Sequence, residues 1–123
     1  NFIKLAESDY YVGTYFHRVI PDFMIQGGCP NTKNADRSDD GRGGPGYKFA
    51  DEPVRQQYVD GAVAMANSGP NTNGSQFFID IADDTTKLQP LYNLFGKVQT
   101  GLDVAKQIQK GDVMTTVVVR EQQ

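Results

Sequence analysis

Hydrophobic and polar positions follow one another in short groups along this chain, and their spacing predicts most of its elements. Residues 1–9 mix apolar and polar side chains at the spacing of the end of an amphipathic helix. Groups of β-branched and aromatic residues, bounded by glycine, proline and asparagine, then predict strands. These groups fall within residues 10–20, 23–27, 61–66, 76–82, 93–98 and 114–120.

A second helix is predicted in the last quarter of the chain. Thr100 and Asp103 have the spacing of a capping box, with Asp in the place of Glu, and Gly111 stands where a glycine would end the helix. Several short strands with two helices indicate a mostly β fold, in which an antiparallel sheet closes toward a barrel capped by the helices. At 123 residues the chain is expected to form a single domain over residues 1–123.

The most informative polar segment is the loop within residues 65–79. It joins two apolar strands through a run of Asn, Ser, Gly, Pro and Thr, which are residues that favour turns. The loop is longer than a hairpin turn, and long ordered loops often carry function. Because amide side chains both donate and accept hydrogen bonds, this loop suits the binding of an extended peptide. It suits metal or nucleophile chemistry poorly.

Composition excludes several classes of function. The 12 basic and 15 acidic residues give a net charge of −3 without a basic cluster, so nucleic acid is not an expected partner. Cys29 is the only cysteine, which excludes an internal disulfide and indicates a buried, small apolar residue. With His17 as the only histidine, no ordinary zinc site can be assembled. We expect neither a metal nor a cofactor.

The ends of the chain bear on its location. No segment has the length of a transmembrane helix, and none has the pattern of a signal peptide. The chain opens with Asn-Phe-Ile-Lys rather than with Met, and we read it as processed or truncated at its N-terminus. A cytoplasmic monomer is expected.

Two motifs mimic ligand sites. Residues 41–46 match the spacing G-x-G-x-x-G, but a polar loop precedes them and no helix follows, so they lack the context of a dinucleotide fingerprint. Residues 36–41 begin like a calcium-binding loop. The bidentate acid of such a loop is replaced by Tyr47, and the flanking helices are missing. A solvated acidic loop is the better interpretation.

Two longer motifs resemble those of the cyclophilins, the peptidyl-prolyl cis-trans isomerases. Residues 16–28 read FHRVIPDFMIQGG, and residues 65–79 read MANSGPNTNGSQFFI. Residues 94–98, LFGKV, are similar to the next family block, and the loop at 41–46 resembles the bacterial form. The resemblance covers essentially the whole chain. It implies an eight-stranded antiparallel barrel capped by two helices, of which this chain would lack the first strand or two and the start of the first helix.

The resemblance also implies a catalytic arginine. Rotation about an X–Pro bond faces a barrier of about 18–20 kcal/mol, and lowering it requires no nucleophile or metal. By similarity, Arg18 donates hydrogen bonds to the twisted amide, whose proline nitrogen has become more basic. The alternative for Arg18 is an ordinary strand arginine in a surface ion pair. Gln26 matches a residue that orients Arg18 and the substrate carbonyl.

The resemblance assigns substrate contacts to further positions. Phe78 faces the proline pocket and Phe77 the core, since neighbouring strand residues point to opposite faces. Asn67 pairs through its backbone with the peptide, and His17 matches a site histidine that could equally be structural. The other pocket positions are Phe23, Met24 and Leu88, for each of which ordinary core is the alternative, and the groove positions are Gly41, Ala66, Ser68, Thr72, Asn73 and Gln76.

Two positions depart from the family pattern. Tyr92 stands where many members have histidine, and it is counted among the substrate-binding residues. Lys87 replaces an aromatic residue, typically tryptophan, so we expect weakened binding of cyclosporin because the indole N–H and flat apolar face are lost.

The expected partners are proline-containing peptides and unfolded proteins. The expected function is therefore a peptidyl-prolyl cis-trans isomerase that acts in protein folding without covalent catalysis. The alternatives are a non-catalytic proline-peptide-binding module, serving as chaperone or scaffold, and a fragment that does not fold because open strand edges remain.

Overall fold

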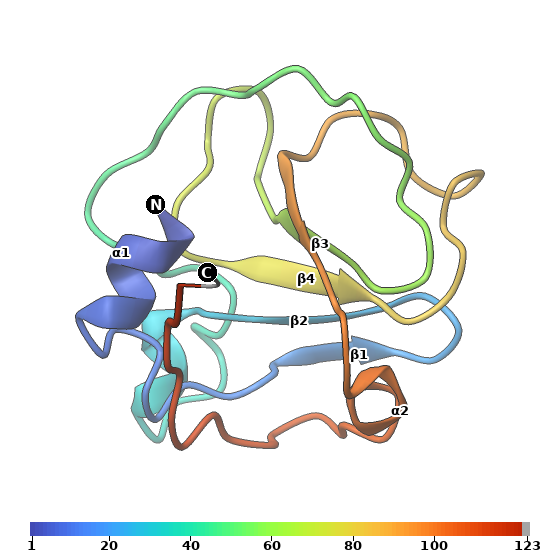
Figure 1. The fold of residues 1–123 in the computed structure, drawn as a ribbon. Helices are drawn as coiled ribbons and strands as arrows, with labels where there is room; N and C mark the ends of the chain where they lie inside the picture. Colours follow the sequence, from blue (N-terminus) through green and yellow to red (C-terminus); the bar gives the residue numbers. More distant parts are fainter. Residues whose placement is uncertain (122–123) are drawn as a thin grey trace.

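The computed structural model describes residues 1–121 of the chain and shows a mostly β fold. Short helices lie between and beside the strands of one antiparallel sheet (Figure 1). The elements are α1 (Phe2–Glu7), β1 (Arg18–Ile20), β2 (Met24–Gly27), a 3₁₀ helix (Pro30–Lys33), β3 (Ala62–Met65), β4 (Phe77–Asp80), β5 (Leu94–Lys97) and α2 (Leu102–Ala105).

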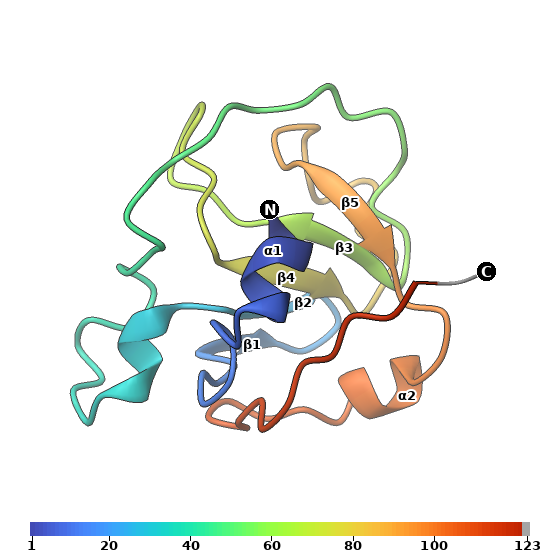
Figure 2. The same cartoon turned by 60° about the vertical axis from the view of Figure 1, so that its left-hand side comes forward.

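The five strands form one sheet in the order β1-β2-β4-β3-β5, and all neighbours are antiparallel. The motif at 16–28 becomes the β1–β2 hairpin, whose turn places Asp22 at a positive φ of 58°. The motif at 65–79 becomes the end of β3, a polar loop and β4. Strand β4 is therefore central, and β5 lies at the outer edge beside β3 (Figure 2).

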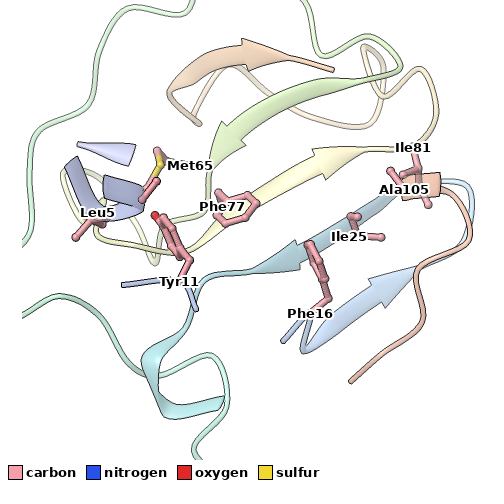
Figure 3. Close-up of a cluster of buried hydrophobic side chains, with 9 residues drawn as sticks. Leu5, Tyr11, Phe16, Ile25, Met65, Phe77, Ile81 and Ala105 are labelled. Atoms are coloured by element: carbon pink, nitrogen blue, oxygen red, sulfur yellow. The ribbon is translucent and has the colours of Figure 1, made fainter. Parts of the chain in front are cut away.

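One face of the sheet carries the main hydrophobic core. Phe77 of β4 lies at its centre, with Ile25 from β2 and Met65 from β3 (Figure 3). The rings of Phe2 and Tyr11 both pack edge-on against Phe77, at centroid distances of 5.2 and 5.4 Å. Helices α1 and α2 and the segment at 114–119 contribute further apolar side chains to this core. Alternation along the strands thus gives the sheet one face for the core.

The opposite face carries a second, smaller cluster. Met24 of β2, Ala64 of β3 and Phe78 of β4 are buried there together with Tyr58. Residues 23, 88 and 92, which come from the turns and loops, pack against this cluster. The division between Phe77 and Phe78 is therefore the one that strand alternation predicts.

The sheet differs from the closed eight-stranded barrel that we expected. It has five strands within residues 1–121, and it is not closed. The predicted strand at 114–120 is not formed, because its backbone pairs only at its beginning: Met114 exchanges hydrogen bonds with Gly13 and Thr14, and Val113 forms an isolated bridge with Tyr15. Past that point the segment packs on the core through Val117 and Val119 without a partner strand among the described residues.

The second helix also differs from its prediction. It is only four residues long, and its N-cap is Gly101, not Thr100. Gly101 takes a left-handed φ of 87°, which glycine adopts readily, and no side-chain cap is formed. The first helix lies within the predicted residues 1–9. In the described part of the chain, no helix is long and apolar enough to cross a membrane.

Candidate active site

Three neighbouring strands place the central candidate residues in one row. Arg18 of β1 stands opposite Gln26 of β2, and Gln26 stands opposite Phe78 of β4. Residues paired in this way across an antiparallel sheet present their side chains on the same face, with Cβ atoms about 4.5–5.5 Å apart. The register of the sheet thus brings a cation, an amide and an aromatic ring together on the face opposite the main core.

A cavity of about 120 Å³ opens above this row. It is well below the roughly 300–1,000 Å³ of sites for drug-sized ligands and has room for a small ring. Six of its nine lining residues are apolar or aromatic, and Arg18, Gln26 and Asn67 contribute polar groups. Its lining residues are Arg18, Phe23, Met24, Gln26, Ala66, Asn67, Phe78, Leu88 and Tyr92. All nine were predicted from the sequence as catalytic or substrate-binding residues.

Aromatic packing fixes the inner wall of the cavity. The Tyr92 ring meets the Phe78 ring edge-on, with centroids 5.5 Å apart and an interplanar angle of 88°. Tyr58 lies behind both rings, 6.5 Å from Phe78 and 6.3 Å from Tyr92. Its hydroxyl donates to the backbone oxygen of Tyr92 at 2.6 Å and accepts from the backbone N–H of Tyr92 at 3.0 Å. Tyr58 therefore holds a loop residue in place against the sheet.

Lys87 lies next to Phe23, outside the residues that line the cavity. Its ammonium group donates to the backbone oxygen of Asp22 at 2.6 Å and lies 6.0 Å from the centroid of the Phe23 ring. It also lies 3.6 Å from a carboxylate oxygen of Asp84. Lys87 thus connects the β1–β2 turn to the loop that carries Leu88.

A second cavity of about 360 Å³, lined mostly by polar residues and glycines, adjoins the first. The two share Gln26, Ala66 and Asn67 in their linings, so together they form one continuous groove. Of the predicted groove residues, Gly41, Ser68, Thr72 and Gln76 also line the second cavity. A substrate longer than one residue could therefore extend from the apolar cavity along a polar surface.

The side chains of two glutamines order the floor of this groove. Gln26 donates to the side-chain oxygen of Gln76 at 3.0 Å. Gln76 in turn donates to the backbone oxygens of Gly41 and Gly43 at 2.8 and 3.0 Å. From behind, the buried sulfur of Cys29 accepts the N–H groups of the same two glycines, each at 3.3 Å. The loop at 41–43 is thereby held to the row of site residues.

Asn67 keeps its backbone free while its side chain is engaged. The side-chain amide donates to Leu91 O at 2.9 Å, and its oxygen accepts from Gly69 N at 3.3 Å. Within residues 1–121, no hydrogen bond to protein uses the backbone N–H or C=O of Asn67. These two groups are available to pair with the main chain of a bound peptide.

Two predicted site residues border neither cavity. Asn73 is fully buried and donates to Phe49 O and to the Asp51 carboxylate, at 3.0 and 2.9 Å. His17 is half-buried and lies against Gly41, where an added Cβ would come within 3.2 Å of Nε2. Burial lowers the pKa of His17, against an opposing effect of Asp40, so the neutral imidazole is favoured. Both residues support the groove from behind, and their assigned roles stay predictions.

Sequence reasoning missed part of the groove and its support. The added lining residues are Arg42, Gly43, Gly44, Pro45, Tyr47, Lys48, Gly74 and Ser75. Most lie in the long polar loop, and the run of glycines there was the signal that could have indicated a backbone surface open to a ligand. Nothing in the local sequence of Tyr58 indicates that it anchors Tyr92. No cluster of three possible metal ligands occurs among the described residues.

Comparison with known proteins identifies the family of this chain. The model of the family "Cyclophilin type peptidyl-prolyl cis-trans isomerase/CLD" matches residues 1–122. The chain belongs to this family. As a cyclophilin, it has the function of a peptidyl-prolyl cis-trans isomerase, which the names of its relatives also carry.

The relatives come from bacteria and eukaryotes. The cyclophilin chain is 45% identical over 119 residues to peptidyl-prolyl cis-trans isomerase B of Bacillus subtilis, which covers 95% of this chain and 78% of that protein. It is 48% identical over 113 residues to peptidyl-prolyl cis-trans isomerase-like 1 of Rhizopus delemar, covering 88% of this chain and 64% of that protein. The chain thus spans between about two thirds and four fifths of the length of these relatives.

A solved structure agrees with the described fold. A cyclophilin-type isomerase from Cryptosporidium parvum matches with a TM-score of 0.82 at 32% identity, covering 99% of this chain and 84% of that chain. That protein was crystallised in the presence of the dipeptide Ala-Pro.

Proposed function

We propose that this cyclophilin isomerises X–Pro bonds at the apolar cavity and that Arg18 is its catalytic residue. The observation that carries the proposal is the row formed by Arg18, Gln26 and Phe78 on three adjacent strands. The apolar wall would hold the proline ring, and the adjoining polar groove would hold the flanking peptide. The use of the dipeptide Ala-Pro in crystallising the Cryptosporidium relative supports a ligand of this kind.

The proposed mechanism relies on differential hydrogen bonding. In the planar ground state, resonance draws electron density away from the proline nitrogen, and the twisted amide restores it. A guanidinium group carries a permanent charge and a rigid fork of donors. Hydrogen bonds that the guanidinium group donates to the amide stabilise the twisted state more than either planar isomer. The barrier to rotation is therefore lowered without a covalent intermediate.

The surroundings of Arg18 favour this role over a structural one. No carboxylate of residues 1–121 forms an ion pair with its guanidinium group. Arg18 is exposed at the cavity and is not committed to a surface salt bridge, which was the alternative interpretation. Gln26, its cross-strand neighbour, is fixed by Gln76 and can orient both the arginine and a substrate carbonyl.

The backbone of Asn67 supplies the proposed contact with the main chain of the substrate. Its free N–H and C=O groups lie where the apolar cavity meets the polar groove. A peptide that pairs with this backbone in an extended conformation would be recognised through its main chain, as in strand addition. The enzyme would then accept many sequences around proline, which suits unfolded and flexible proteins.

The test compares Arg18 variants by exchange NMR on an acetylated, amidated Ala-Pro peptide, so that no coupling protease is needed. We expect Arg18→Ala to lower kcat/KM by about 10²- to 10³-fold, the loss typical of one transition-state donor group. Arg18→Lys should recover only part of the activity, because a lysine lacks the fork. Arg55→Ala, an exposed arginine outside both linings, is the matched control.

Two outcomes would overturn the proposal. Rate acceleration that Arg18→Ala leaves unchanged would exclude Arg18 as the catalytic residue. Shifts of the Phe78 and Tyr92 resonances on adding peptide, without any acceleration by the unaltered chain, would favour the alternative of a non-catalytic peptide-binding module.

A further inference from the structure

Two carboxyl groups are completely buried next to the cavity without belonging to its lining. Asp80 is the last residue of β4, and Asp84 lies in the loop that follows. Each has 0% of its surface exposed. Aspartate is rarely buried to this extent unless it is paired or hydrogen-bonded, because a buried charge without partners is costly.

The surroundings of the pair offer little compensation for negative charge. Within residues 1–121, no donor forms a hydrogen bond to any of the four carboxyl oxygens. The nearest cation is Lys87, 3.6 Å from Asp84 Oδ1. Asp60 acts on Asp80, and Asp83 acts on Asp84, with further negative charge, while the Tyr58 hydroxyl is the remaining titratable group near Asp80. Two ionised carboxylates would therefore stand unbalanced here.

A single proton resolves this conflict. Each carboxyl group acts on the pKa of the other, so the two lie close enough to share a proton. A protonated carboxyl group has the O–H donor that the other carboxylate lacks, so one shared proton satisfies both. Burial and the neighbouring Asp84 raise the pKa of Asp80 to about 9, and burial also raises the pKa of Asp84. Groups coupled in this way titrate as a pair.

The pair is joined to the wall of the cavity through short hydrogen bonds. The backbone oxygen of Asp84 accepts from Lys87 N and Leu88 N at 2.9 and 3.0 Å. The backbone N–H of Asp84 donates to Tyr58 O at 2.9 Å, and Tyr58 in turn holds Tyr92.

The sheet register provides a second connection to the cavity. Asp80 stands opposite Met24 and two residues after Phe78, so it shares their face of the sheet.

We infer that Asp80 and Asp84 share one proton and that this protonated pair is a positioning unit for the Leu88 and Tyr92 wall of the cavity. When the proton leaves, the two carboxylates repel each other, and the loop at 83–88 moves away from β4. The cavity then loses part of its apolar wall, and proline peptides bind more weakly. This inference rests on the proposed use of the cavity as the proline pocket.

The experiment measures KM and kcat by exchange NMR on the same capped peptide from about pH 7 to about pH 9.5, a range that includes the titration of a raised carboxyl pair. His17 is neutral there, because burial lowers its pKa. We expect KM to rise by about threefold or more with a smaller change in kcat, as expected for lost apolar contact. In Asp80→Asn and Asp84→Asn, the amide donates to the remaining carboxylate at every pH, so KM should stay level.

The matched control is Asp83→Asn, the same substitution at an exposed position in the same loop, which should keep the alkaline rise of KM. A second readout, ¹³C NMR of labelled aspartate carboxyl groups in the unaltered chain, does not depend on activity or on variants that fold. It should show two coupled groups with one alkaline transition. Independent titration of both groups at their ordinary acidic pKa would overturn the inference, even if catalysis is intact. A coupled titration in a chain without catalysis would instead contradict the proposed function alone.

Discussion

At the scale of single residues, the side chain of Cys29 shows how a buried group can shape an exposed surface. It is fully buried, as expected for a lone cysteine, yet it is not merely apolar filling. Its sulfur accepts the N–H groups of Gly41 and Gly43, which line the polar groove. A small, weakly accepting side chain thus fixes the backbone of a loop that lacks a strand or helix of its own.

This contact gives a prediction for the groove. Cys29→Ala leaves two backbone N–H groups without an acceptor, which should lower the free energy of unfolding by about 1–3 kcal/mol and raise KM by loosening the loop. Cys29→Ser keeps an acceptor oxygen and should retain more of both properties than the alanine variant. Urea denaturation and peptide titration measure the two effects. Equal values for the alanine and serine variants would show that the sulfur contacts are unimportant.

At the scale of elements, strand β4 separates stability from binding within two adjacent residues. Phe77 packs against Phe2, Tyr11 and Phe16 in the main core, and Phe78 packs against Tyr58 and Tyr92 at the cavity. Both rings are about 95% buried, so their exposure alone would not distinguish them. The face of the sheet determines which property each ring serves.

Matched leucine substitutions should separate the two properties. We expect Phe77→Leu to lower the free energy of unfolding by about 1–3 kcal/mol, as is usual for a disturbed core, with KM nearly unchanged. Phe78→Leu should raise KM more than Phe77→Leu does, because the lost ring forms part of the cavity wall. Equal effects of the two variants on KM, measured on the capped peptide after stability is checked by urea denaturation, would contradict this division.

The same element shows what the sequence can and cannot predict. The β1–β2 hairpin, β3 and β4 follow from local alternation, and so does the opposite orientation of Phe77 and Phe78. The support from Tyr58 could not be predicted, because it depends on a contact with Tyr92 across 34 residues. The prediction of a capping box at Thr100 was wrong, because Gly101, with its left-handed φ, is the N-cap of the helix. Closure into a barrel was wrong because the segment at 114–120 pairs only at its start.

At the scale of the whole molecule, the buried acid pair should make stability depend on pH. Since the pKa of Asp80 is raised to about 9 in the folded chain, the folded state binds a proton that the unfolded state has released. The free energy of unfolding therefore falls as pH rises between the ordinary carboxyl pKa of about 4 and about pH 9. The slope for one proton is at most about 1.4 kcal/mol per pH unit.

Urea denaturation in steps between about pH 7 and about pH 9 would measure this slope, which one-proton linkage predicts. We expect Asp80→Asn to flatten it and Asp83→Asn to leave it in place. A slope that is the same in all three chains would show that other groups cause it.

The alignment of Arg18, Gln26 and Phe78 across three hydrogen-bonded strands also has a thermal consequence. Their spacing is set by the ladder of the sheet, not by the mobility of a loop. Moderate heating cannot separate Arg18 from Phe78 unless the strands themselves come apart. At a pH where the acid pair keeps its proton, we therefore expect catalytic turnover to increase with temperature up to the onset of cooperative melting, without an earlier phase in which the row of Arg18, Gln26 and Phe78 is lost while the sheet is intact.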